Sequence, residues 1–274
     1  MQNIFEERIS KPFNIKIRKE KQMKKTISMV LLIAALITAF YTCAYAGTPI
    51  LDDQAVRFVS LDGDSISFDC GGVTASGSTL SISAPGIYSL SGTLNDGQIR
   101  VSVASDEKVE IELNGVTITS LTGPAIYVEN ADKVTLDIAD GTYNTITSGD
   151  EQTYASFDDS RSEAAVYSKD DLKIKGHGTI TINGNINNGL ASKNDIDIKN
   201  ASVFVNAVNN GIKGNYSVEI TDASVTVNAG NDGIKTDTTK EGKGYVTVTG
   251  STLTINAKDA VKADSTVLIV SEIQ

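Results

Sequence analysis

The chain has 274 residues, of which 40% are apolar and 21% charged, so it can bury a core and lacks the bias of disordered or collagen-like chains. Its formal net charge is −10. Such an acidic surface repels nucleic acid and anionic membranes, and we exclude both as partners unless a cation bridges the two surfaces. One or two domains are expected from this length.

Residues 1–46 have the features of a bacterial secretory signal peptide. The segment that starts at Met23 has a basic beginning, an apolar run and then Ala44-Tyr45-Ala46, a small-x-small cleavage signal. Translation starts either at Met23 or at Met1 with an unusually long basic region. An uncleaved membrane anchor is the alternative, but the apolar run is nearer to signal-peptide length. We predict cleavage after Ala46, secretion to the extracellular space and no membrane attachment afterwards.

The chain that remains after cleavage is more acidic than the precursor. It has 16 basic and 31 acidic residues, which gives a net charge of about −15. Cys70 is its one cysteine, so no internal disulfide can form. A bound metal ion is a plausible substitute for a disulfide in an exported protein.

Two regions follow the signal peptide. Residues 47–104 contain short strand and turn patterns with weak repetition, and we interpret them as N-terminal strands, a cap and the first coils. Residues 105–274 repeat with a unit of about 22 residues and two insertions. The repeats align on these apolar residues, each of which begins a strand: Val109, Val134, Leu172, Ile196, Val218, Val246 and Val267.

Within each unit, apolar residues alternate with polar ones over three short stretches, as in Ile196 and Ile198, then Val203 and Val205. This period of two predicts three strands for each unit. Such a unit cannot bury its apolar face alone, so successive units must stack about 4.8 Å apart with parallel pairing. The sequence therefore predicts an all-β fold, a right-handed single-stranded parallel β-helix. An antiparallel sandwich is the competing interpretation, but its strands would not require asparagine and glycine to recur at a fixed spacing of about 22 residues.

Two columns of turn residues support the β-helix. One is an asparagine column that follows the second strand of each unit, and the other is a glycine column with one alanine. Asparagine tolerates the left-handed conformation and can donate a hydrogen bond to the copy in the next coil. The columns are Asn183, Asn206, Asn228 and Asn256, and Gly189, Gly211, Gly233 and Ala260. The sequence stops after an apolar strand without a polar cap, so we interpret residues 105–274 as truncated at the C-terminus.

The candidate site is a motif that recurs around each glycine-column position, which is its third residue. The copies are "NNGLASK", "NNGIKGN", "NDGIKTD" and "KDAVKAD". Stacking these copies on one outer face brings together carboxylate and amide oxygens, which suit Ca²⁺. The predicted metal ligands are Asp232, Asp237, Asp259, Asp264, Asn210 and Asn231. The predicted ligand-binding residues are Lys213, Lys235, Lys262 and Asn188. The alternative is that the three lysines neutralise the acids in a surface ion-pair ladder without metal.

Other polar segments are less informative. The acidic insertion from Ser148 to Ala164 could form a lid over this face, or it could be a solvated loop. A smaller insertion, Thr238 to Lys243, directly follows the site. His177 has no neighbouring pattern of a catalytic serine or cysteine, so a structural role is expected.

The segment "EAAVYSKDDLKIKGHGTITINGNINNGLASKNDI", followed by "NDGIKTD", resembles a family of secreted bacterial carbohydrate-binding β-helix proteins. The resemblance covers roughly residues 88–270. It implies a pectate-lyase-like architecture, calcium binding and association with cellulose or polygalacturonate-like polymers of plant cell walls. Tyr167, Tyr216 and Tyr245 could stack on sugar rings if they face outward, whereas the chain has no tryptophan for a flat cellulose-binding platform.

Three functions are compatible with the sequence. The first is calcium-dependent, non-enzymatic binding of a polysaccharide, uronate-containing or cellulosic, by a monomer. The second is a calcium-dependent pectate-type lyase in which Lys213, Lys235 or Lys262 removes the proton next to the uronate carboxylate. The third is a surface or adhesin repeat without a sugar ligand. We expect the first, with Ca²⁺ bridging the protein to an acidic polymer.

Overall fold

The computed structural model describes residues 55–149, 164–238 and 240–270, which all belong to one compact unit, Ile50–Gln274. The predicted signal peptide lies outside the described residues, as does nearly all of the insertion from Ser148 to Ala164. Within the described ranges every regular element is a β-strand. No helix in these ranges has the length and apolar character needed to cross a membrane.

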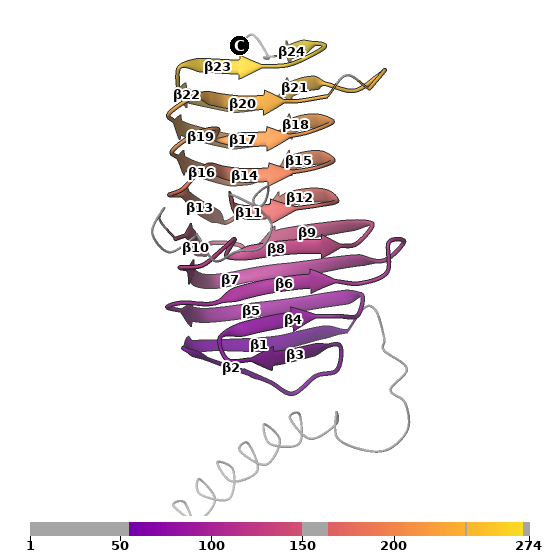
Figure 1. Ribbon diagram of the computed structural model, residues 1–274, viewed down its shortest axis with the longest axis vertical. Helices are drawn as coiled ribbons and strands as arrows, with labels where there is room; N and C mark the ends of the chain where they lie inside the picture. Colours follow the sequence, from indigo (N-terminus) through magenta and orange to yellow (C-terminus); the bar gives the residue numbers. More distant parts are fainter. Residues whose placement is uncertain (1–54, 150–163, 239, 271–274) are drawn as a thin grey trace, which may run out of the picture. The chain divides into compact units, whose positions relative to one another are not determined.

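The strands form a right-handed parallel β-helix in which successive coils stack along one axis (Figure 1). Each complete coil contributes three strands, one to each of three faces. Parallel partners lie one coil apart, and Ile212 pairs with Ile234 in the next coil, 22 residues on. The predicted fold class is confirmed.

We name two of the three faces by the chemistry of their outward side chains and the third by its groove. The charged face consists of the first half of β7 (Lys108–Ser120) together with β9 (Lys133–Ile138), β12 (Asp171–Gly176), β15 (Asp195–Lys199), β18 (Ser217–Thr221), β21 (Tyr245–Thr249) and β24 (Val267–Val270). The hydroxyl-amide face consists of the second half of β7 together with β10 (Tyr143–Ser148), β13 (Thr179–Gly184), β16 (Ser202–Ala207), β19 (Ser224–Ala229) and β22 (Thr252–Asn256). Because β7 extends across both faces, their strands form one sheet.

The third face, which we call the groove face, is a separate sheet. Its strands in spatial order are β23 (Asp259–Lys262), β20 (Asp232–Thr236), β17 (Ile212–Gly214), β14 (Asn188–Ser192), β11 (Ala164–Ser168), β8 (Ile126–Asn130), β6 (Gln98–Ser102), β4 (Thr79–Ile82) and β3 (Val73–Ser76). At the N-terminal end, β1 (Val56–Gly63) pairs antiparallel with β2 (Ser65–Phe68) and parallel with β5 (Gly86–Leu94). The pair of β3 and β4 is also antiparallel.

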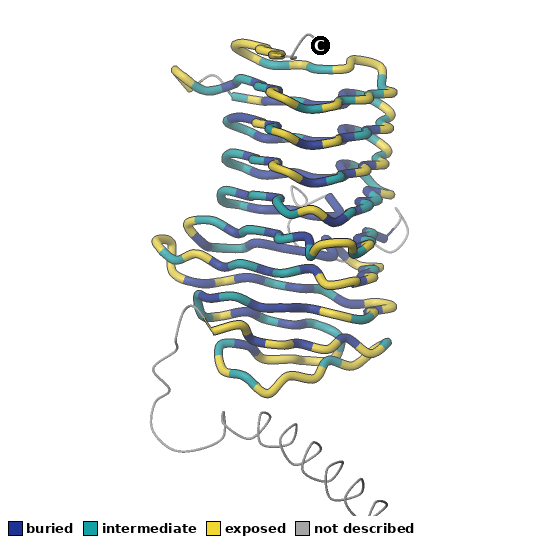
Figure 2. The backbone as a smooth tube through the Cα atoms, turned by 180° about the vertical axis from the view of Figure 1, so that it is seen from behind, coloured by how far each residue is buried: buried dark blue, intermediate teal, exposed yellow. Residues whose placement is uncertain are grey.

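The register agrees with the alignment of repeats made from the sequence. Val109 pairs with Val134, and the same column continues through Leu172, Ile196, Val218, Val246 and Val267. Residues of this column up to Val246 are buried, because alternate side chains of each strand point into the coil (Figure 2). The core is therefore one continuous stack of aliphatic side chains.

The two predicted columns are present, but the asparagines lie within β13, β16, β19 and β22 and none of them has a positive φ, so they are not the turn residues that the sequence predicted. Asn206 Nδ2 donates to Asn183 Oδ1 at 2.9 Å, and Asn228 Nδ2 donates to Asn206 Oδ1 at 3.0 Å. The glycine column lies against the core: a Cβ at Gly211 would stand 2.2 Å from Val227 Cγ1. A side chain at this position is excluded by close packing, which explains the glycine.

Candidate functional site

The outward residues of the groove face form the predicted lysine column. Ala191, Lys213, Lys235 and Lys262 pair in register from one coil to the next. Between them the inward residues Leu190, Ile212 and Ile234 are fully buried. Lys213 and Lys235 lie partly exposed and Lys262 is exposed, so the column faces outward as the alternation predicts.

Lys213 and Lys235 form ion pairs with Asp237. Lys213 Nζ lies 3.0 Å from Asp237 Oδ2, and Lys235 Nζ lies 3.9 Å from the same oxygen. The hydrogen bond from Lys213 is the main cause that lowers the pKa of Asp237 below its ordinary value. At this position the structure therefore shows the ion-pair ladder that was the alternative to a metal site.

Asp232 corrects the expectation that the whole motif lies on the outer surface. It pairs with Asp259 in the next coil as predicted, but its side chain is 0% exposed. Asp232 has the same parity as the buried residues Ile234 and Thr236, and only the buried Gly233 departs from strict alternation at the start of β20. Neither carboxylate oxygen of Asp232 has a hydrogen-bond partner, and Lys235 Nζ lies 3.9 Å from Oδ2.

The predicted convergence of four carboxylates on one cation is not found among the described residues. Asp264 Oδ2 accepts a hydrogen bond from the backbone N–H of Thr238 at 2.6 Å, and Asp237 is paired with lysine. In the described ranges no group of three or more His, Cys, Asp or Glu residues lies close enough to hold a metal ion. Calcium binding by these residues stays a prediction.

The predicted amide ligands form a buried ladder. Asn210 Nδ2 donates to Asn188 Oδ1 at 2.8 Å, and Asn231 Nδ2 donates to Asn210 Oδ1 at 3.2 Å. The backbone N–H of Asp232 also donates to Asn210 Oδ1, at 3.3 Å. The Asn210 oxygen is thus already occupied by two donors, and Asp232 ends the ladder because a carboxylate has no proton to pass on.

Next to the lysine column, the groove face is hollowed by a groove of about 610 Å³. Its lining consists of Tyr167, Lys169, Asn187, Asn188, Ala191, Ser192, Lys193, Asn194, Lys213, Asn215 and Tyr216. Three of these residues are lysines and four are asparagines, and among the described residues none of the lining is acidic. In a strongly acidic protein this is a local basic, amide-rich site.

Aromatic side chains form part of the groove face. The rings of Tyr127 and Tyr167 stack with centroids 6.0 Å apart and an interplanar angle of 23°. Tyr216 has Lys240 Nζ 4.6 Å and Lys243 Nζ 5.3 Å from its ring centroid. Lys243 in turn pairs with Asp195 Oδ2 at 2.8 Å. The small insertion after the site therefore packs its lysines against a groove tyrosine.

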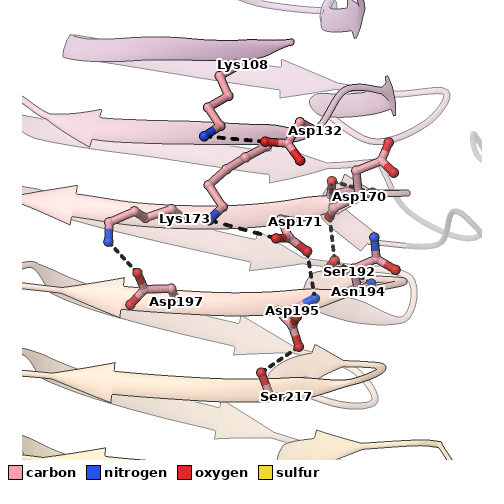
Figure 3. A network of polar contacts seen from close by, with 12 residues as sticks. Lys108, Asp132, Asp170, Asp171, Lys173, Ser192, Asn194, Asp195, Asp197 and Ser217 are labelled. Carbon is pink, nitrogen blue, oxygen red and sulfur yellow. Dashed lines mark hydrogen bonds and ion pairs between the residues drawn. The ribbon is translucent and has the colours of Figure 1, made fainter. Parts of the chain in front are cut away.

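A polar network fixes the groove from the side of the charged face (Figure 3). Ser192 Oγ donates to the Asp170 carbonyl at 2.7 Å and accepts from the Asn194 N–H at 2.9 Å. Burial is the main cause that raises the pKa of both Asp170 and Asp171, and the negative charge of Asp195 contributes at Asp171. These contacts order the backbone that presents Ser192 and Asn194 to the groove.

Comparison with known proteins identifies the family. Residues 76–272 match the family described as "Carbohydrate-binding domain-containing protein". The chain belongs to this carbohydrate-binding domain family. A member from Acetivibrio thermocellus is 40% identical over 242 residues, which cover 85% of each chain.

A solved structure resembles this carbohydrate-binding domain closely. It is described as "Structure of the polysaccharide lyase-like protein from C. thermocellum, Gadolinium derivative". The TM-score is 0.73 at 33% identity, and the match covers 79% of this chain and 97% of the other. The pectate-lyase-like architecture expected from the sequence agrees with that description.

Within the carbohydrate-binding domain, the structure divides the predicted ligand-binding residues. Lys213 and Asn188 line the groove, whereas Lys235 and Lys262 continue the lysine column beyond it. The sequence did not single out Lys169 or Asn194, whereas Lys193 ends the recurring motif "NNGLASK" but was not assigned a role in binding. These residues could be recognised only once the coils were stacked, because they lie just after groove-face strands of consecutive coils and come together only in space.

Of the three tyrosines proposed to stack on sugar if they face outward, Tyr216 lines the groove and is partly exposed. Tyr167 also borders the groove but is 3% exposed and packs in a buried cluster with Tyr127, so its ring does not face outward. Tyr245 instead lies on the charged face, where its hydroxyl donates to Glu219 Oε1 at 2.8 Å. That hydrogen bond is the main cause that raises the pKa of Tyr245. Tyr245 is therefore not part of the groove.

Proposed function

We propose that this chain is a secreted, non-enzymatic module that binds plant cell-wall polysaccharide, with a preference for uronate-containing polymers and a dependence on calcium. Membership of the carbohydrate-binding domain family supports the coarse function. The preference for uronate-containing polymers rests on the groove, where three lysines and four asparagines adjoin the partly exposed ring of Tyr216. Lysines attract carboxylates, amides bond sugar hydroxyls, and tyrosine rings pack against the apolar faces of pyranoses.

The calcium part of the proposal depends on Asp232. A fully buried carboxylate without hydrogen-bond partners is costly unless a positive charge compensates it. Lys235 at 3.9 Å supplies part of that compensation. Asp259 lies in register one coil above and is exposed, so a Ca²⁺ ion held by these two residues would still accept uronate oxygens as ligands. Two carboxylates do not complete the coordination of Ca²⁺, so the ion would need further oxygen ligands from the polysaccharide or from water.

Retention on immobilised polygalacturonate, with Ca²⁺ or with EDTA, tests the proposal. We expect retention in Ca²⁺ that falls at least tenfold in EDTA. Asp232→Asn with Asp259→Asn should lose the calcium effect, and Lys193→Gln with Lys213→Gln should weaken retention in both buffers. Lys199→Gln, on the charged face, is the matched control. Equal retention of the wild type in both buffers would overturn calcium dependence, and no retention on any polysaccharide would favour the adhesin-like alternative.

A pectate-type lyase is the second candidate, and the description of the solved relative as polysaccharide lyase-like favours it. Proton removal needs a neutral amine, and Lys213 and Lys235 instead contact carboxylates. Incubation with polygalacturonate and Ca²⁺, followed by ultraviolet absorbance of unsaturated uronates, tests this. We expect no product, and product that disappears in Lys213→Ala or Lys235→Ala would establish the enzyme.

A further inference from the structure

The corner that follows β20 is longer than the corresponding corners of the three preceding coils. Two residues join β11 to β12, β14 to β15 and β17 to β18, whereas eight residues join β20 to β21 (Figure 1). The six additional residues are the insertion Thr238 to Lys243, of which the structure describes all but residue 239. Insertions into single repeats form loops on one face of a stacked fold, and that face often binds ligands.

The insertion folds back onto a residue of the groove. Lys240 Nζ lies 4.6 Å and Lys243 Nζ lies 5.3 Å from the centroid of the Tyr216 ring, which belongs to the preceding coil. The backbone N–H of Gly244, directly after the insertion, donates to the Tyr216 carbonyl at 2.6 Å. Because Tyr216 lines the groove of about 610 Å³, both ammonium groups lie at the wall of that groove.

Lys243 is held by a carboxylate two coils away. Its Nζ donates to Asp195 Oδ2 at 2.8 Å and to Asp195 Oδ1 at 3.2 Å. Ser217 Oγ donates to Asp195 Oδ1 at 2.7 Å and so fixes the carboxylate from the coil between them. The hydrogen bond to Asp195 is the main cause that raises the pKa of Lys243. Hydrogen bonds between two charged groups are stronger than neutral ones, so Lys243 anchors the insertion.

Lys240 is held less strongly than Lys243. It is exposed, and in the described part of the chain no ion pair joins it to a carboxylate, although Glu241 is its neighbour. Its contact with the Tyr216 ring is a cation–π interaction, which is weak at an exposed site. A carboxylate from a ligand would offer Lys240 a stronger, charge-assisted hydrogen bond. Lys240 is therefore able to leave the ring for an anionic ligand while Lys243 keeps the insertion in place.

The position of Lys240 affects neutral and acidic sugars differently. The hydroxyl groups of a neutral sugar bond an ammonium group less strongly than a carboxylate does, so the ring of Tyr216 would stay covered. The carboxylate of a uronate would draw Lys240 away and leave the ring free to pack against the pyranose. Charge recognition and ring stacking would then occur together, which increases the difference in affinity between the two kinds of sugar.

We propose that Lys240 is a specificity-determining residue of the groove, which covers Tyr216 until a carboxylate binds and so selects uronates over neutral or esterified sugars. Lys243 and Asp195 are positioning residues that act through it. The inference rests on the function proposed for the groove and adds the basis of its selectivity. Neither lysine belongs to the recurring motif, so this selectivity is a property of the one coil that carries the insertion.

The test compares retention of the full chain on polygalacturonate and on its fully methyl-esterified form, both in Ca²⁺. The two polymers share a backbone and differ in charge, and the wild type should prefer the acidic form at least tenfold. Lys240→Gln should lower this preference at least threefold, through weaker retention on polygalacturonate and stronger retention on the ester. Lys199→Gln, on the charged face, is the matched control and should change neither. These variants keep Asp232 and Asp259, so a calcium bridge would contribute equally to all.

Asp195→Asn separates positioning from long-range electrostatics. Removal of this carboxylate makes the surroundings of the groove more positive, which alone would strengthen retention on polygalacturonate. Loss of the anchor should instead lower the preference for the acidic polymer at least threefold. The same variant should lower the pKa of Lys243, which NMR titration of its Nζ signals measures without any polymer. If Asp195→Asn does not fold, Lys243→Gln removes the same anchor from the side of the insertion and should lower the preference equally.

Three results would overturn the proposal. An unchanged preference in Lys240→Gln would exclude this lysine and leave the groove as the binding site. Stronger retention of Asp195→Asn on polygalacturonate would show that charge alone, without positioning, decides binding. Wild-type protein that is retained on neither polymer would refute the function proposed for the groove, and the inference with it.

Discussion

At the scale of single residues, Asp232 and Asp237 lie five positions apart and have opposite surroundings. Asp237 has a half-exposed side chain and two lysines within 4 Å, whereas Asp232 is buried without a hydrogen bond. Residues five positions apart have opposite parity, so alternation from the inward Ile234 puts Asp232 on the buried side and Asp237 on the exposed side. The expectation that the whole motif lies outward did not apply this parity to Asp232.

For Asp237 we predict a titration below the usual range that depends on Lys213. The pKa of Asp237 is lowered in the folded state, so its pair with Lys213 stabilises the fold above the unfolded pKa and loses that effect as the pH falls through the folded pKa. Lys213→Gln should raise the pKa of Asp237. Carboxyl NMR titration of both proteins measures this, and an unchanged pKa would contradict the ion pair.

For Asp232 we predict that Asn is more stable than Asp in EDTA. An asparagine of nearly the same shape would remove a buried charge that has no hydrogen-bond partner. The gain in the free energy of unfolding should be about 1–3 kcal/mol. Urea unfolding in EDTA measures it.

If Asp232 binds Ca²⁺, adding calcium should make the wild type more stable than Asp232→Asn. The wild type would gain stability as Ca²⁺ is added, by about 2.7 kcal/mol at a hundredfold excess over the dissociation constant, and Asp232→Asn would not. If Ca²⁺ raised the free energy of unfolding of both proteins by the same amount, Asp232 would not be a calcium ligand.

At the scale of elements, the sequence predicted register better than it predicted sites. Strand partners such as Leu172 with Ile196 were identified because a one-residue slip would expose an entire apolar column. The groove was not predicted, although Lys193 and Asn215 end two copies of the recurring motif, because the alignment of repeats does not show where the face is hollowed.

The glycine column gives a prediction at this scale. Gly211→Ala would place Cβ 2.2 Å from Val227 Cγ1 and 2.7 Å from the Gly233 carbonyl oxygen, so the coils must move apart. We expect a loss of about 1–3 kcal/mol in the free energy of unfolding, typical of overpacking. Ala260→Gly is the matched control, because Ala260 is exposed in the last complete coil. Equal urea midpoints for Gly211→Ala and the wild type would show that the column tolerates a side chain.

At the scale of the whole molecule, a β-helix buries each strand edge against the next coil, except at its ends. On β24 the side chains of Val267, Leu268, Ile269 and Val270 are 45–57% exposed. Val267 and Ile269 continue the core column above Val246 and Val248, and among the residues that the structure describes they pair on one side only. The apolar column is therefore fully buried only where a coil lies on both sides, so the stability of each coil depends on its neighbours.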